Sequence, residues 1–259
     1  MIKIYILMHK PDNHVLKIKD PIYIPLHCGK KIYIKDSDEF LPELGDDIGN
    51  NISNKNPYYS ELTGHYWIWK NDTSLPDDII GTVHYRRYFS EPVIESEEEN
   101  ELLSEETINR LLQDNDFIIC GIPTDYDTTK NDDESAYSNY GENHIIEDLD
   151  NALKHIKILF PDLYETINHE VRHSGSMCLC NMMITRKKCF DEYCNFIFTV
   201  FKQLEYDIDF DDQNHQGYNQ RVFGFLSERL FRPWLKAKGY IAVQGRGLDW
   251  EKYSGYVWE

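Results

Sequence analysis

Two adjacent arginines follow an apolar segment of the sequence. Residues 79–83 (IIGTV) are predicted to form a strand, and residues 84–87 (HYRR) continue it directly. Guanidinium groups beside a buried strand are costly unless an anion meets them. Arginine holds phosphate oxygens with two parallel N–H groups and stays charged at any working pH. Arg86 and Arg87 are therefore predicted to bind a phosphate-bearing ligand. The alternative, that they pair with Glu61 or with aspartates and brace the sheet edge, stays open.

Further polar residues follow the first predicted strand, residues 3–8. His9 and Lys10 come directly after it, at a strand end of the kind where open α/β sheets bind ligands. Glu61 opens an aromatic-rich predicted helix and is a second candidate for that site. Both have alternatives, since His9 can be a surface histidine in a turn and Glu61 can simply favour the helix dipole. Arg221, near the start of the last predicted helix, is another candidate for holding phosphate.

A long polar segment, residues 124–143, is predicted to be a loop that contacts a second substrate. Loops of more than ~15 residues in a compact domain are usually functional. Tyr137, Tyr140 and the following His144 are the candidate residues for that contact. Asp148 is the first candidate for a general base, because it follows the loop and is predicted to cap a helix. Its capping position is also a complete structural explanation.

The acidic and cysteine residues of the sequence do not decide whether the protein binds a metal ion. Asp-x-Asp triplets, which are typical of metal sites, begin at residues 125, 148 and 207, but 45 acidic residues produce such triplets by chance. No cofactor is firmly predicted, and a divalent metal, Mn²⁺ or Mg²⁺, stays open. A zinc site can be drawn from Cys178, Cys180, Cys189 and Cys194, although these fall in apolar strand and helix patterns and not at a knuckle turn. Six cysteines without a secretory signal instead indicate buried free thiols in the reducing cytoplasm.

Alternating strand and helix patterns position these residues. The pattern is typical of an α/β, Rossmann-type three-layer sandwich around a mainly parallel sheet, with residues 3–8 as an interior strand. Glu228 and Arg229 are predicted to form a buried ion pair that fixes the last helix. The other predicted strands are 22–26, 32–34, 79–83, 117–120 and 177–185, and the predicted helices are 56–70 with Asn56 as cap, 104–114, 148–159, 161–171, 188–205 and 218–238, broken near Pro233.

The composition of the chain limits the classes of molecule that it can bind. The net charge of −18 argues against nucleic acid, whose binding needs clustered lysine and arginine. No apolar run approaches the ~20 residues of a membrane span, so we expect no transmembrane segment, while peripheral membrane association is allowed. The 259 residues suffice for one domain with a full core.

Three groups of segments stand out together: 49–56 (GNNISNKN) with 60–63 (SELT) and 66–71 (YWIWKN); 80–89 (IGTVHYRRYF); and 180–184 (CNMMI) with 221–225 (RVFGF) and 227–230 (SERL). They resemble the capsular-polysaccharide-synthesis glycosyltransferase domain family, formerly a domain of unknown function. The likeness spans residues 1 to about 236. It departs from the family at Asn50, where relatives often have aspartate, and in the acidic composition of residues 124–143.

This resemblance implies a single GT-A-like domain that transfers a sugar from a nucleotide diphosphate, most simply a UDP-sugar, to a saccharide or lipid-linked saccharide of a capsule, exopolysaccharide or lipopolysaccharide. It implies a donor-binding half of about residues 1–120 and an acceptor-side half of about 121–259. Arg86 and Arg87 would stabilise the leaving diphosphate, and Asp148 would be the base. The implied donor-binding residues are His9, Lys10, Glu61, His84, Tyr85, Arg86, Arg87 and Arg221; the acceptor-binding residues are Tyr137, Tyr140 and His144.

Two other functions stay open from the sequence. One is a nucleotide-sugar-modifying or phosphate-ester enzyme on the same frame, and the other is a non-catalytic module that binds nucleotide sugar or carbohydrate. An oxidoreductase of the Rossmann class would need a Gly-x-Gly-x-x-Gly turn after the first strand, and residues 9–12 (HKPD) are not one.

Overall fold

The computed structural model describes residues 1–35, 38–90, 102–120, 135–175, 177–249 and 255–256. Its strands form one mixed sheet in which β1 lies between β2 and β3 and runs parallel to both. The predicted interior strand is thereby confirmed. The strands are β1 (Ile2–Met8), β2 (Tyr23–His27), β3 (Ile79–His84), β4 (Arg87–Ser90), β5 (Phe117–Cys120), β6 (Met183–Arg186), β7 (Ala242–Asp249) and β8 (Gly255–Tyr256).

The sheet is mainly parallel. β6 runs antiparallel to both β3 and β5, and β7 runs parallel to β5, so β1, β2, β3, β5 and β7 share one direction. β4 returns from β3 through a tight turn and pairs with β7. The predicted α/β class with a mainly parallel central sheet is confirmed.

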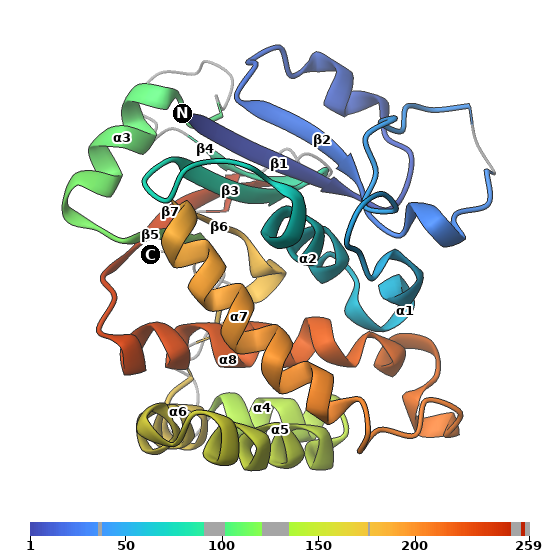
Figure 1. Cartoon of the computed structure of the whole chain (residues 1–259), viewed down its shortest axis with the longest axis vertical. Helices are drawn as coiled ribbons and strands as arrows, with labels where there is room; N and C mark the ends of the chain where they lie inside the picture. The colour runs from blue at the N-terminus through green and yellow to red at the C-terminus, as the bar shows by residue number, and fades with distance from the viewer. Residues whose placement is uncertain (36–37, 91–101, 121–134, 176, 250–254, 257–259) are drawn as a thin grey trace.

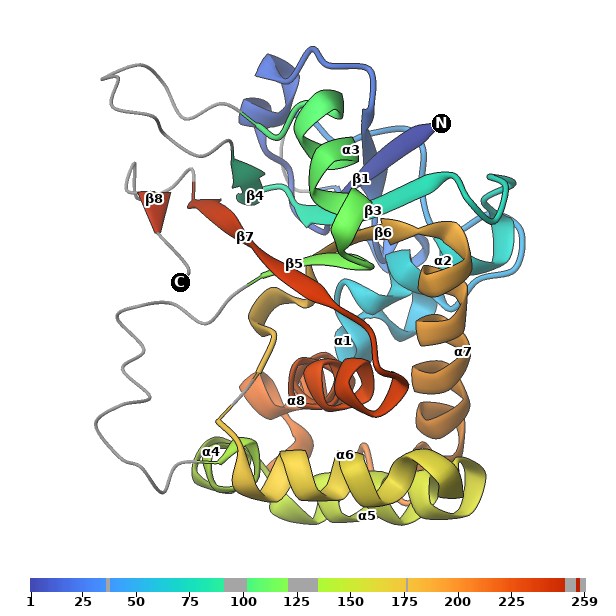
Figure 2. The same cartoon turned by 90° about the vertical axis from the view of Figure 1, so that its left-hand side faces the viewer.

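Helices cover both sides of these strands. In both Figure 1 and Figure 2, α3 lies above β5 and β7, and α8 lies below them. Beneath α7 and α8, a further helical layer is formed by α4, α5 and α6. The helices are α1 (Asn56–Tyr59), α2 (Leu62–Asn71), α3 (Glu105–Asp114), α4 (Ala136–Asn143), α5 (Ile146–Leu159), α6 (Pro161–His173), α7 (Lys187–Leu204) and α8 (Val222–Lys238), with short 3₁₀ turns that include η2 (Lys30–Ile32), η5 (Leu179–Asn181), η6 (Gln213–His215) and η7 (Gly217–Arg221).

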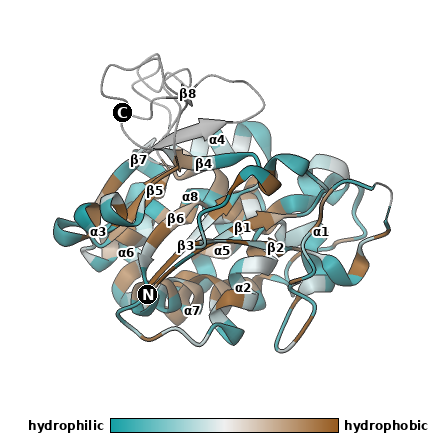
Figure 3. Ribbon diagram, turned by 90° about the horizontal axis from the view of Figure 1, so that it is seen from above, coloured by the Kyte–Doolittle hydropathy of each residue, from teal (hydrophilic) through white to brown (hydrophobic). Residues whose placement is uncertain are grey.

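The core explains the apolar strand patterns. Every β1 residue except Lys3 is buried, because helices and neighbouring strands enclose it. Hydrophobic residues follow the central strands in Figure 3, whereas hydrophilic ones cover much of α3. Trp234 of α8 packs against Tyr193 and Phe196 of α7, at ring centroid distances of 5.2 and 6.0 Å. Among the described residues, no helix has both the length and the apolar character needed to cross a membrane.

Several predicted elements differ from the structure at their ends or in type. Residues 32–34 were predicted as a strand, but the chain turns through η2 there. Residues 177–185 form a strand only from Met183, since η5 precedes it. The last helix begins at Val222 and continues through Pro233, because apolar packing around Phe231 and Trp234 holds it together. Strands β4 and β7 were not predicted.

The segment predicted as one helix over residues 56–70 is two helices, α1 and α2. Ser60 separates them with φ +50°, a left-handed conformation that disfavours a continuous helix. Asn56 is not a cap but lies inside α1, where its side-chain amide donates to the Ser60 carbonyl at 2.8 Å and to Thr63 Oγ1 at 3.1 Å.

Eight of the twenty residues of the predicted loop over residues 124–143 are helical. Residues 136–143 form α4, which Ser135 caps by accepting a bond from the Ser138 backbone N–H. Residues 124–134 lie outside the described part of the chain.

Candidate functional site

A cavity of about 550 Å³ opens at the carboxyl ends of β1 and β3. β1 ends at Met8 and β3 at His84, and because the strands are parallel both ends meet at one edge of the sheet. The structure brings together there all of the residues predicted to bind the donor: His9, Lys10, Glu61, His84, Tyr85, Arg86, Arg87 and Arg221. Their roles remain predictions, but their convergence is a property of the fold.

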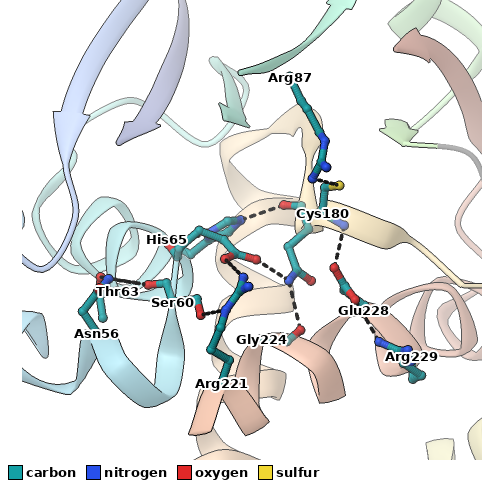
Figure 4. A network of polar contacts seen from close by, with 12 residues as sticks. Asn56, Ser60, Thr63, His65, Arg87, Cys180, Arg221, Gly224, Glu228 and Arg229 are labelled. Atoms are coloured by element: carbon teal, nitrogen blue, oxygen red, sulfur yellow. Dashed lines mark hydrogen bonds and ion pairs between the residues drawn. The ribbon is translucent and has the colours of Figure 1, made fainter. Parts of the chain in front are cut away.

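The β3–β4 hairpin presents two of the cavity's cations. His84 pairs with Arg87 across the turn, so Tyr85 and Arg86 form its tip. The Arg86 guanidinium lies 4.9 Å from the centre of the Tyr85 ring, and its Nε is 4.0 Å from Asp12. Arg87 reaches across to donate from Nη1 to Cys180 Sγ at 3.0 Å (Figure 4).

Arg221 enters from the opposite wall, at the start of α8. Its Nε donates to Ser60 Oγ at 2.9 Å, and its Nη2 lies 4.0 Å from Glu61 Oε2. Figure 4 shows Arg221 and Arg87 approaching the same region from different elements. The Ser60 break between α1 and α2 therefore supplies a hydroxyl that positions this arginine.

Glu61 is a buried carboxylate beside these cations. Its Oε1 accepts a 2.7 Å hydrogen bond from the Asn181 side chain. Burial by itself would raise the pKa of Glu61, but His84, the Asn181 bond and Arg221 together outweigh it and hold that pKa below the usual value. Glu61 is therefore charged at neutral pH and balances part of the positive charge.

Two histidines of the cavity are neutral at pH 7. Loss of solvent at the cavity lowers the pKa of His9 to about 4, helped by Lys10 and Arg221, although part of the His9 side chain stays exposed. Burial lowers the pKa of His84 to about 4 as well, against the opposing effect of Glu61. Among the described residues, the buried His84 Nε2 has no hydrogen-bond partner. These rings can donate or accept hydrogen bonds to a ligand without adding charge.

Glu228 of α8 is a second buried carboxylate in the cavity wall. Its Oε1 accepts from the Cys180 backbone N–H at 2.7 Å, and its Oε2 accepts from Arg229 Nη1 at 2.8 Å. The predicted ion pair with Arg229 is confirmed. Burial raises the pKa of Glu228 to about 7 despite Arg229 and the Cys180 bond. The sequence reasoning missed its place in the cavity, although its spacing of seven residues from Arg221 puts both on one helix face.

The backbone is strained around this cavity. Among the described residues, positive φ at a non-glycine position occurs only at Ser60, Cys180 and Asn181, with values of 50°, 73° and 50°. Ser60 and Cys180 line the cavity, and Asn181 binds Glu61. Such conformations cost on the order of 1–3 kcal/mol each and are concentrated at functional sites.

A family model described as a domain of unknown function, DUF4422, matches residues 3–239. The chain belongs to this family. A solved structure, the WbbM bifunctional glycosyltransferase in its apo form, superposes with a TM-score of 0.78 at 28% sequence identity, covering 96% of this chain and 45% of that one. The chain thus spans less than half the length of that enzyme. No curated protein matches it.

The predicted base, Asp148, lies elsewhere in this DUF4422 protein. It is not the cap of α5, which begins after Ile145, but sits in the first turn of that helix. Its buried carboxylate accepts from His215 Nε2 at 3.1 and 3.2 Å. Burial raises the pKa of Asp148, and His215 opposes that shift. Asp148 is not among the residues that line the cavity holding Arg86 and Arg87.

The three predicted acceptor residues have different surroundings in the fold. His144 lines a second cavity of about 630 Å³, between the α4–α5 connection and η6, which His215 also lines. Tyr140 is buried, with its ring 4.9 Å from that of His144. Tyr137 instead donates to Asp150 at 3.1 Å and lies 4.1 Å from the Arg172 guanidinium. Only His144 of the three lines this second cavity.

The two cavities share one short wall. Gly217, Gln220 and Arg221 of η7 line the first cavity, while Gln216 and Asn219 line the second. His144 Nδ1 lies 3.2 Å from the Asn219 carboxamide oxygen, and burial lowers the pKa of His144 to about 4. A neutral histidine and several carboxamides thus face the second cavity.

The described part of the chain contains no group of three or more His, Cys, Asp or Glu side chains placed to hold a metal ion. The Asp-x-Asp triplets that begin at residues 148 and 207 lie in the described part of the chain, and the one at 125–127 lies outside it. All six cysteines are buried free thiols.

Proposed function

We propose that this chain is a glycosyltransferase of the GT-A-like class that takes a sugar from a nucleotide diphosphate, a UDP-sugar in the simplest case. The acceptor would be a saccharide or lipid-linked saccharide of a capsule, exopolysaccharide or lipopolysaccharide. The similarity to one part of a bifunctional glycosyltransferase supports the activity. The buried free thiols fit work in the reducing cytoplasm.

The observation that carries the proposal is the cavity at the ends of β1 and β3. Lys10, Arg86, Arg87 and Arg221 line it, in a chain whose net charge is −18. Cations gathered against the overall charge fit an anionic ligand, and arginines fit phosphate in particular. The volume of about 550 Å³ lies in the range of small-molecule sites.

In this proposal the donor half of about residues 1–120 is completed by α8. Arg86 and Arg87 stabilise the negative charge of the departing diphosphate. Arg221, which Ser60 Oγ holds in place through a hydrogen bond, adds a third positive charge. On the acceptor side, residues 121–259 supply the cavity around His144, whose carboxamides can bond sugar hydroxyls. Because η7 borders both cavities, an acceptor lying along it would point toward the donor.

The test is a panel of nucleotide sugars, measured for thermal stabilisation and for release of nucleoside diphosphate. A ligand that binds the folded chain raises its Tm by mass action. We expect nucleotide sugars of one nucleotide class to raise Tm and to be cleaved, so that nucleoside diphosphate is released. We also expect His144→Ala to raise the KM for an active acceptor while leaving the donor KM unchanged. A rise in Tm without turnover of any donor and acceptor would instead indicate a non-catalytic binding module.

A further inference from the structure

We propose that Glu228 is the general base that takes the proton of the acceptor hydroxyl during sugar transfer. The inference rests on the proposed function and assigns to α8 the chemical role that the sequence had suggested for Asp148. It follows from three observations: the place of Glu228 in the wall of the donor cavity, the two bonds that fix its carboxylate, and its electrostatic contrast with Glu61.

The carboxylate of Glu228 is held in a defined orientation at the cavity. The Cys180 backbone N–H fixes one oxygen and Arg229 fixes the other, so the group cannot rotate freely. Each carboxylate oxygen has a further lone pair that can accept a hydrogen bond from a ligand. Arg229 is anchored in turn by the Asn139 side chain at 2.9 Å.

Cys180 connects the proposed base to the proposed leaving-group cation. Its Sγ accepts from Arg87 while its backbone N–H donates to Glu228 (Figure 4). The left-handed backbone of Cys180, with φ 73°, belongs to this arrangement. One strained residue thus contacts both the cation for the diphosphate and the base for the acceptor, as expected of a preorganised site.

The two carboxylates of the cavity differ in basicity. Burial raises the pKa of Glu228 to about 7, with Glu61 adding to the rise and with Arg229, the Cys180 N–H and Arg221 opposing it. The pKa of Glu61 is instead lowered. A general base works best when its pKa is near the operating pH, and paired groups with divergent pKa values commonly divide such roles. Glu228 is therefore the better proton acceptor of the two.

The proposed step balances as a single displacement. The acceptor oxygen forms a bond to the anomeric carbon as its proton passes to the Glu228 carboxylate. The bond from that carbon to the diphosphate oxygen breaks, and the electron pair leaves with the diphosphate beside Arg86 and Arg87. Because attack comes from the face opposite the leaving group, the anomeric configuration inverts. Glu228 then returns its proton to solvent.

The test compares Glu228→Gln with the wild type and with Glu170→Gln. Glu170 also contacts α8 through an ion pair, with Lys236 at 2.7 Å, and does not line the cavity. We expect Glu228→Gln to lower kcat by ~10²–10⁴-fold, the usual contribution of a general base, with the Kd of the nucleoside diphosphate changed by less than about threefold. Glu170→Gln should keep wild-type kcat.

The pH profile and the product provide independent readouts. Wild-type kcat should rise with pH through about 7, because only the charged carboxylate accepts a proton, and that limb should be absent in Glu228→Gln. If Glu228→Gln does not fold, Glu228→Asp is the alternative variant, because it keeps the carboxylate but withdraws it by one methylene. A folded Glu228→Asp with a large loss of kcat would support Glu228 as the general base.

Full activity with an unchanged pH profile in either variant overturns the inference while leaving the proposed function standing. Product with the donor's anomeric configuration retained also overturns it. If the wild type neither binds nor cleaves any nucleotide sugar, the proposed function itself fails, and the role of Glu228 with it.

Discussion

Arg87 is the exposed first residue of the otherwise buried strand β4, and it extends into the cavity at the ends of β1 and β3, where Cys180 Sγ accepts from its guanidinium. If its charge stabilises the leaving diphosphate, Arg87→Ala should lower turnover by ~10²-fold or more, the scale seen when one transition-state donor is lost. Arg87→Lys should recover only part, since an ammonium cannot bind two oxygens in parallel. Steady-state kinetics measure both, with Arg110→Ala, an exposed arginine of α3, as the control.

The same kinetics distinguish three roles: that Arg87 stabilises the diphosphate, that Arg87 only stabilises the sheet edge, and that a metal ion stabilises the diphosphate instead. A fall in Tm with unchanged activity of the folded fraction would mean that Arg87 only braces the sheet edge. Activity that persists in EDTA favours the arginines, whereas activity lost in EDTA and restored by Mn²⁺ or Mg²⁺ would assign the charge to a metal.

Among the elements, α2 determines where Glu61 lies, and Gly64 determines how closely α2 approaches the sheet. A Cβ at Gly64 would lie 2.7 Å from Cys28 Sγ and 2.8 Å from Leu7 Cδ2, closer than real contacts allow. Gly64→Ala should therefore lower the free energy of unfolding by ~1–3 kcal/mol, the usual cost of overpacking. It should also weaken nucleotide binding, because α2 and Glu61 must shift away from β1.

Gly141→Ala is the matched control within a helix. Gly141 is exposed in α4, and a Cβ there would meet nothing closer than 3.4 Å. Alanine should stabilise that helix by ~0.5–1 kcal/mol through backbone entropy. Urea unfolding measures both variants, and equal effects of the two would show that α2 does not depend on a close approach at Gly64.

For the whole molecule, histidine titration governs the acid side of stability. The pKa values of His9, His27, His65, His84 and His144 are all lowered, chiefly by burial. Each contributes stability that is complete above the unfolded value near 6.5 and is lost as pH falls toward the folded value. Glu228 acts in the opposite sense, since its raised pKa of about 7 adds stability as pH falls below 7.

Because the five histidines outnumber the carboxyl groups whose pKa burial raises, Glu228, Asp148 and Asp191, the free energy of unfolding should be lower at pH 5.5 than at pH 7.5, with His27→Asn showing a smaller difference. Urea titrations at the two pH values measure this. Equal stability at both values would contradict the prediction. In Glu228→Gln the difference should be larger than in the wild type, because the opposing contribution is removed.

The sequence by itself determined the α/β class, the interior strand β1 and several of the polar residues that line the cavity at the ends of β1 and β3. Apolar runs encode burial on two faces, and polar residues directly after such runs lie at strand ends. Parallel strands bring those ends to one edge, so His9 and residues 84–87 meet without any further information. The Arg229 ion pair with Glu228 was also accessible, because the two residues are neighbours.

Only the tertiary structure decided that Glu228 lines the cavity and that Asp148 does not. Glu228 reaches Cys180 over 48 residues of chain, and Asp148 is bound by His215 over 67. The Ser60 hydroxyl at the helix break likewise accepts a hydrogen bond from Arg221, which is 161 residues away. Local sequence patterns show the periodicity of hydrophobic residues and therefore which ones are buried. Contacts between residues far apart in the sequence are instead determined by how the whole chain packs. For that reason the spacing of residues was enough to predict that Lys10, Arg86 and Arg87 lie together, whereas the position of Glu228 beside them came from the fold.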